Sequence, residues 1–122
     1  MDAAQARQLK IKTGALTRSL KDITSYNKER EQQETKVANI RSEESQLPAE
    51  EQDPGRVNRA EAELAETVAV IPTVVVKIEN WMVELEGVMA TIEDTSAANM
   101  DEIKESDEWK ASLAAIEAAR QF

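Results

Sequence analysis

A heptad repeat between residues 57 and 92 restricts the folds open to this chain more than any other feature. One apolar row recurs every seven residues, and a second row follows its members by four. Burying each side chain contributes roughly 1.5–3 kcal/mol, so the seam must pack against another helix. The seam comprises Val57, Leu64, Val68, Ile71, Val75, Ile78, Met82, Leu85, Met89 and Ile92. A third row, Val74, Trp81 and Val88, predicts contact with two neighbouring helices.

Two breaks divide the helical pattern into three segments. The first break is SQLPAEEQDPG, where two Pro and a Gly mark a turn. Asp53 followed by Pro54 predicts a helix start, because the carboxylate can accept from free backbone N–H groups. The second break is EDTSAANMDE, after which Asn99 is one candidate cap and Ser106 is a later one. We therefore predict helices at about 4–46, 54–93 and 99–121.

Short connections between these helices make neighbours antiparallel. The predicted fold class is all-α, as one domain over residues 1–122. It is an elongated antiparallel three-helix bundle with two long helices and one shorter C-terminal helix. The third helix reaches only Ile71 to Ile92 of the second, so residues 30–70 should form a bare two-helix hairpin. Folding at the turn places residue i near residue 101 − i. Gly14 then faces Gly87, which predicts a close helix approach there.

The composition argues against catalysis. There is no Cys and no His, which removes thiol chemistry and the commonest general base and transition-metal ligand. Ser and Thr have no His to act as base, and no Gly-rich phosphate loop is present. The carboxylates lie in runs such as EAELAE, which are typical of solvated helix faces. We expect neither an enzyme, nor a cofactor, nor a metal site.

Charge is unevenly distributed along the chain. The net charge is −9, but residues 1–41 hold nine Lys/Arg against five Asp/Glu. An acidic chain is not expected to bind nucleic acid. No apolar run approaches the ~20 residues that span a bilayer, and MDAAQARQLK is too polar for a signal peptide, so we expect no membrane and a cytoplasmic location. The basic first helix either packs against the acidic remainder or meets an acidic partner. The candidate partner-binding residues are Lys10, Lys12, Arg18, Lys21, Lys28 and Arg30.

Several segments of the chain form a recognisable series. The opening QLKIKTGALTRSLKD, with KIKTG at its core, is the most specific of them. It is followed by EREQQETKVANIR, the pair Ile71–Pro72 and EWKASLAAIE. In this order the segments resemble the tubulin-folding cofactor A family, also called tubulin-specific chaperone A. The resemblance implies a three-helix protein of the cytoplasm and cytoskeleton. It would bind and hold β-tubulin on the pathway to the α/β-tubulin heterodimer, without ATP.

Three alternatives stay open at this point. Three-helix bundles of similar size also serve as structural coiled-coil modules of trafficking or scaffold systems. Part of the basic set could instead pair with Glu84, Glu86 or Glu93 inside the bundle and contribute to stability. The protein could be a monomer, or its bare hairpin could pair with a second copy in a homodimer.

Overall fold

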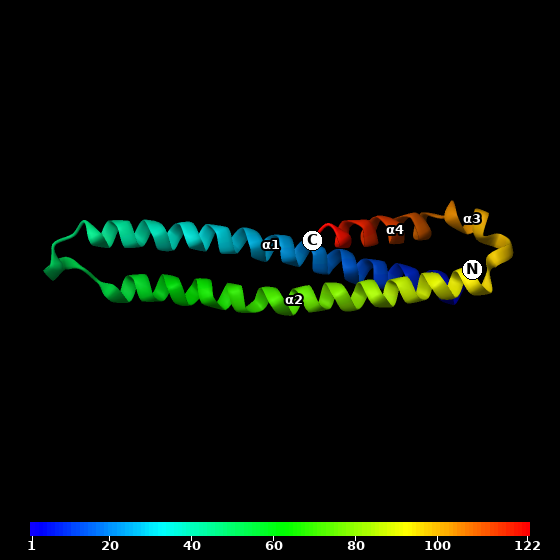
Figure 1. Cartoon of the computed structure of the whole chain (residues 1–122), viewed down its shortest axis with the longest axis horizontal. Coiled ribbons are helices and arrows are strands. Elements are labelled where there is room, and N and C mark those ends of the chain that lie inside the picture. The colour runs from blue at the N-terminus through cyan, green and yellow to red at the C-terminus, as the bar shows by residue number, and fades with distance from the viewer. The chain divides into compact units, whose positions relative to one another are not determined.

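The computed structural model describes residues 1–122, and its regular structure is entirely helical. The long helices are α1 (Ala3–Ser45) and α2 (Pro54–Thr95), whose bounds lie within two residues of those predicted (Figure 1). The shorter elements are η1 (Ala49–Glu51), η2 (Ala97–Asn99), α3 (Met100–Lys104) and α4 (Asp107–Arg120). The predicted all-α helical bundle is confirmed. The chain divides into two compact units, and α1 and α2 contribute a segment to each.

The first unit, here the bundle unit, consists of Met1–Asp22 and Val75–Phe122. It contains the start of α1, the end of α2, and both α3 and α4. Its core combines the apolar face of each helix, and the apolar side chains least exposed to solvent are Leu9, Leu16, Leu85 and Ile92. The hydroxyls of Thr13 and Ser112 lie 2.9 Å apart, so α4 packs beside the first part of α1 (Figure 1).

The C-terminal segment is two helices, where one from 99 to 121 was predicted. Asn99 makes no side-chain cap hydrogen bond. The Ser106 hydroxyl instead accepts a hydrogen bond from the backbone N–H of Trp109 at 3.3 Å and donates to the carbonyl of Ile103 at 2.6 Å. Ser106 therefore ends one helical segment and starts the next, because its hydroxyl satisfies backbone groups that helix ends leave free.

The second unit, here the hairpin unit, is Ile23–Val74 and contains only segments of α1 and α2 around η1. This confirms the predicted two-helix hairpin. Its buried apolar cluster is small, with Val37, Ile40 and Ala60 at its centre. Ion pairs join its helices, and Lys36 lies 3.2 Å from Glu63, close to the predicted register. The other cross-helix pairs are Arg41–Glu61, Arg56–Glu43 and Arg56–Glu44.

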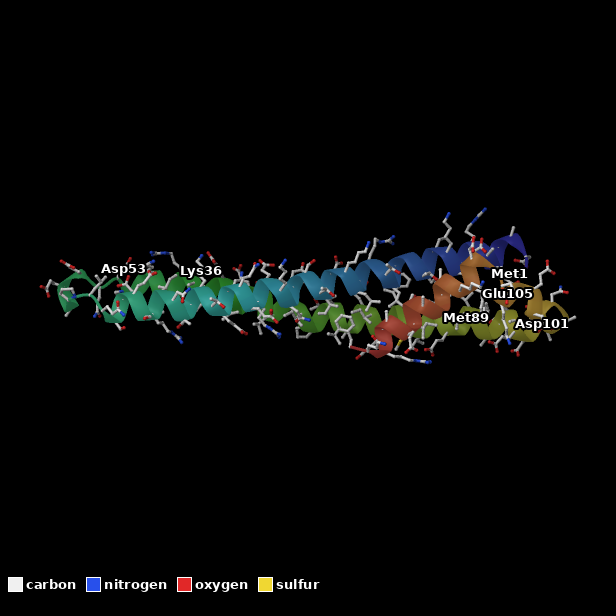
Figure 2. The ribbon with its side chains drawn as sticks, turned by 90° about the horizontal axis from the view of Figure 1, so that it is seen from above. Met1, Lys36, Asp53, Met89, Asp101 and Glu105 are labelled. Carbon is white, nitrogen blue, oxygen red and sulfur yellow. The ribbon has the colours of Figure 1, made fainter.

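The turn of the hairpin is organised by a buried carboxylate. Glu44 is 8% exposed, and its Oε2 accepts the backbone N–H of Asp53 at 2.9 Å. Asp53, at the turn in Figure 2, accepts from the N–H of Gly55 at 3.0 Å, which confirms the predicted start of α2. Arg56 donates to Glu43 at 2.6 Å and lies 3.5 Å from Glu44. These carboxylates, chiefly through the hydrogen bond to Glu43, raise the pKa of Arg56 above its usual value.

The apolar seam of α2 differs from the prediction at two positions. Ile78, Leu85, Met89 and Ile92 are buried, but Val68 and Val75 are exposed. In the hairpin unit the buried positions of α2 are Ala60, Thr67 and Val74. These form a row three residues after the first row of the heptad repeat, Val57, Leu64 and Ile71. A helix with one neighbour buries a narrow stripe, and Val68 lies one residue, or 100°, beyond that stripe.

The predicted approach at Gly14 and Gly87 is wrong. A Cβ atom added at Gly87 would meet nothing within 4 Å, and one at Gly14 would meet only the guanidinium of Arg18, at 3.4 Å. Neither glycine therefore makes room for an opposing helix. Pro72, inside α2, leaves the helix continuous on both sides.

Candidate functional site

The six basic residues proposed from the sequence are divided between the two units. Lys10, Lys12, Arg18 and Lys21 belong to the bundle unit, whereas Lys28 and Arg30 belong to the hairpin unit. Within the hairpin unit, Arg30 Nε lies 3.7 Å from Glu34, one turn along the same helix. The bundle unit therefore holds the larger part of the candidate site.

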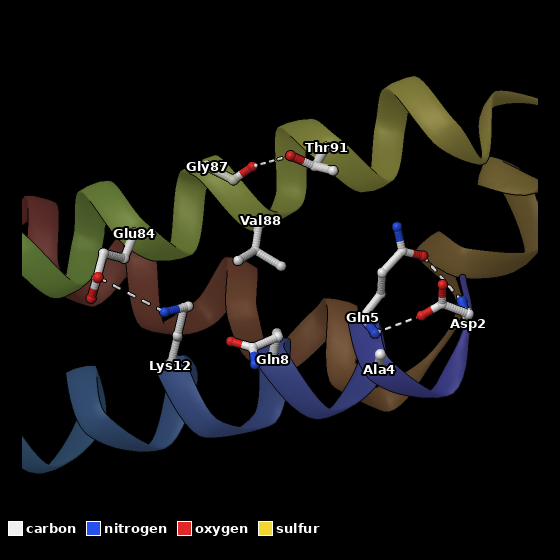
Figure 3. A pocket seen from close by; sticks show the side chains of 9 residues that line it. All are labelled: Asp2, Ala4, Gln5, Gln8, Lys12, Glu84, Gly87, Val88 and Thr91. Atoms are coloured by element: carbon white, nitrogen blue, oxygen red, sulfur yellow. Dashed lines mark hydrogen bonds and ion pairs between the residues drawn. The ribbon is translucent and has the colours of Figure 1, made fainter.

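Lys12 points into the bundle unit. Its Nζ lies 3.9 Å from a carboxylate oxygen of Glu84 and 5.8 Å from the centre of the Trp81 ring, and its side chain is 20% exposed. Figure 3 shows the Lys12–Glu84 pair bridging α1 and α2. Pairing inside the bundle, the alternative stated above, therefore holds for Lys12.

Lys10 and Arg18 lie on another side of α1. They line a groove of about 510 Å³ between α1 and α4, and Asp107 and Glu108 form the facing wall. No ion pair crosses this groove, so both cations remain available to a partner. Lys21, one turn further along α1, is exposed and likewise has no ion pair.

Sequence reasoning missed two members of the same surface, Arg7 and Ile11. Ile11 is 51% exposed, and Arg7 is exposed without an ion pair. At 100° per residue, Arg7, Ile11 and Arg18 fall on one side of the helix. Lys10 and Lys21 lie beside them, within an arc of about 100°, and Lys12 lies outside it. The sequence did hold a signal for this surface, because Arg7, Ile11, Arg18 and Lys21 follow one another at helical spacings of four, seven and three residues. We call the surface the basic strip: Arg7, Lys10, Ile11, Arg18 and Lys21.

A second groove, of about 410 Å³, lies between α1 and α2 (Figure 3). The Lys12–Glu84 pair closes one end, and Asp2 and Gln5 exchange hydrogen bonds of 2.7 and 3.0 Å at the other. The Gln5 amide also donates to the Thr95 hydroxyl at 3.0 Å, which fastens the start of α1 to the end of α2. The absent side chain of Gly87 leaves this groove open.

The bundle unit thus offers an exposed apolar side chain beside unpaired cations, on a helix that packs against two neighbouring helices. Such a surface suits reversible binding to an acidic protein surface with an apolar patch. None of the helices combines the length and the apolar character that a bilayer-spanning segment needs. The structure holds no group of three or more metal-ligating side chains.

Comparison with known proteins gives consistent matches. The family model for tubulin binding cofactor A matches residues 4–109. The chain is 29% identical over 103 residues to tubulin-folding cofactor A of Arabidopsis thaliana, covering 84% of this chain and 85% of the relative. It is also similar to the crystal structure of tubulin folding cofactor A from the same plant. That match has a TM-score of 0.81 and 25% identity, and it covers 99% of this chain and 100% of the other.

Proposed function

Because this chain belongs to the tubulin binding cofactor A family, we propose that it binds β-tubulin and holds it on the pathway to the α/β-tubulin heterodimer. The family has a tubulin-folding role. The choice of β-tubulin, and holding without ATP or catalysis, are our proposal for this chain. Such a protein would act in the cytoplasm, in association with the cytoskeleton.

The basic strip is the observation that carries this proposal. The chain has a net charge of −9, and tubulin is itself acidic, so the overall charges oppose association. Four unpaired cations on one helix face offset that repulsion locally. Exposed Ile11, at the edge of this cluster of cations, adds apolar contact area that charge attraction alone does not provide.

The arrangement of the strip also suits holding and release. The strip lies on a helix whose other sides are already packed, so binding requires little ordering of the chain. Exposed charges are screened by salt, so the complex should weaken as ionic strength rises. A reversible contact of this kind needs no nucleotide.

Charge reversal on the strip tests the proposal. We expect Lys10→Glu with Arg18→Glu to weaken the binding of labelled β-tubulin by roughly tenfold or more, about 1.4 kcal/mol, measured by fluorescence anisotropy. The matched control is Lys77→Glu with Lys104→Glu, which changes the net charge equally at exposed, unpaired positions of the same unit. Equal affinities of the two double variants would refute a role for the strip, and no affinity of the wild type for β-tubulin would refute the function.

Oligomeric state is a separate question with its own measurement. We retain a homodimer through the hairpin unit as the alternative to a monomer, because Val68 is exposed there. Light scattering of the protein, alone and with β-tubulin, distinguishes the two states. A mass of one chain at all concentrations would remove the dimer.

A further inference from the structure

Two adjacent residues of α4 have the reverse of the burial expected from their polarity. Ser112 is fully buried, whereas Leu113 is 50% exposed. The Ser112 hydroxyl donates to the carbonyl of Glu108 at 2.8 Å and lies 2.9 Å from the hydroxyl of Thr13, so its burial is satisfied. Leu113 has no such explanation within the fold. Sequence positions that depart from the burial pattern are often functional.

Leu113 lies in a groove between α2 and α4 of the bundle unit, with a volume of about 570 Å³. Its apolar lining includes the buried side chains of Met89 and Ile116. Met89, labelled in Figure 2, comes from α2, and Ile116 comes from α4. Ala90 and Ala114 add small side chains, which keep the groove open. The groove is therefore a shallow apolar channel between two helices, a shape that accepts the apolar face of a third helix.

The rim of this groove is acidic. Glu86, Glu93 and Glu117 all line it, and Arg120 is the only cation among the lining residues. Arg120 lies 3.4 Å from Glu86 and neutralises that carboxylate. Glu93 and Glu117, one on each helix, have no cation. The groove thus presents an apolar floor with an uncompensated carboxylate on each side.

We propose that this α2–α4 groove binds an amphipathic helix of a basic protein segment. The partner's apolar side chains cover Leu113 and the groove floor, and its Lys or Arg residues pair with Glu93 and Glu117. The charge of the groove is opposite to that of the basic strip on α1. It therefore defines a second interaction surface, beyond the proposed tubulin contact, for a partner of the opposite charge.

The test uses a defined probe, a synthetic amphipathic helix with leucines on one face and lysines on the other. Binding to the whole protein is measured by titration with amide NMR spectra. We expect the amides of Met89, Leu113 and Glu117 to shift, and Leu113→Ser to weaken binding by roughly tenfold or more. Leu113 is half exposed, so this variant should keep the thermal stability of the wild type, which is measured in parallel.

Charge variants separate a specific site from general attraction to an acidic protein. Glu93→Lys with Glu117→Lys should weaken binding of the lysine helix by roughly tenfold or more and reduce its salt dependence. Glu31→Lys with Glu66→Lys makes the same change of net charge at exposed positions of the hairpin unit and should stay within about threefold of wild type. Equal losses in the two double variants would overturn the proposal.

Two further outcomes would also overturn it. A matching peptide with glutamates in place of lysines that binds as tightly would show that charge does not select the partner. Concentration-dependent self-association that Leu113→Ser abolishes, seen by analytical ultracentrifugation, would show that a second copy of this chain occupies the groove instead.

Discussion

Replacing Gly87 with alanine should stabilise the protein. Glycine in the interior of a helix is less favourable than alanine by about 0.8–1 kcal/mol, because it loses more backbone entropy on folding. Gly87 lies well inside α2, and the added Cβ would meet no atom within 4 Å. No steric term therefore opposes the gain, and we expect the free energy of unfolding to rise by about 0.5–1 kcal/mol.

Urea denaturation followed by circular dichroism measures this change. The midpoint should rise while the slope with denaturant stays constant, because the surface exposed on unfolding is unchanged. For a chain of this length the gain corresponds to an increase in Tm of roughly 2–5 °C. Gly14→Ala is the comparison, since its Cβ would reach the flexible Arg18 guanidinium at 3.4 Å.

A loss of stability in Gly87→Ala would refute the reasoning. It would mean that another group approaches this face of α2 more closely than the structure shows. A gain in stability with weaker tubulin binding would instead place a partner in the groove of Figure 3, against the bare backbone of α2.

Three further experiments test the packing of the bundle unit. Ser106→Ala should cost about 1 kcal/mol in thermal unfolding, because it removes the cap at the start of α4. Leu85→Ala, at a fully buried position, should cost about 2–5 kcal/mol by urea denaturation, whereas Leu113→Ala should cost less than about 1 kcal/mol; similar losses would contradict the assigned burial. A double-mutant cycle between Lys12→Met and Glu84→Gln should give a coupling free energy below about 1 kcal/mol, because Glu84 is half exposed. A larger coupling energy would show that the ion pair is stronger than the 3.9 Å distance implies.

The sequence predicted the helices well because helix ends and turns have strong local signals. The pair Asp53–Pro54 located the start of α2, and the heptad row through Ile78 and Leu85 identified a packed helix face. Local signals were weaker after α2, where Asn99 and Ser106 are both residue types that favour N-caps but only Ser106 makes a side-chain cap hydrogen bond. The choice between them depends on where α4 packs, which no local pattern records.

Hydrophobicity alone could not predict which face of α2 is buried in the hairpin unit. Ala60 and Thr67 contribute little apolar surface, and yet they are the buried positions, whereas the larger Val68 is exposed. Small residues allow helices to approach, but a pattern that weights side chains by hydrophobicity overlooks them. The same reason applies to α4, where the small Ser112 is buried and the adjacent Leu113 is exposed.

The candidate site was partly predictable. The excess of cations in α1 is evident from the sequence, and so is their helical spacing. Their separation into paired Lys12 and unpaired Lys10 depends on which flank of α1 the neighbouring helices cover. Two statements stay predictions: the 122 residues act as a single domain, and the protein is not an enzyme.

The hairpin unit combines a small apolar cluster with ion pairs at the protein surface. Dissolved ions screen such pairs, but they leave apolar burial largely intact. Amide hydrogen exchange around Lys36 and Glu61 should therefore accelerate as sodium chloride is added, while the amides around Leu16 and Leu85 change little. Ionic conditions inside the cell would then set how often the hairpin opens, independently of the unit that carries both proposed binding surfaces.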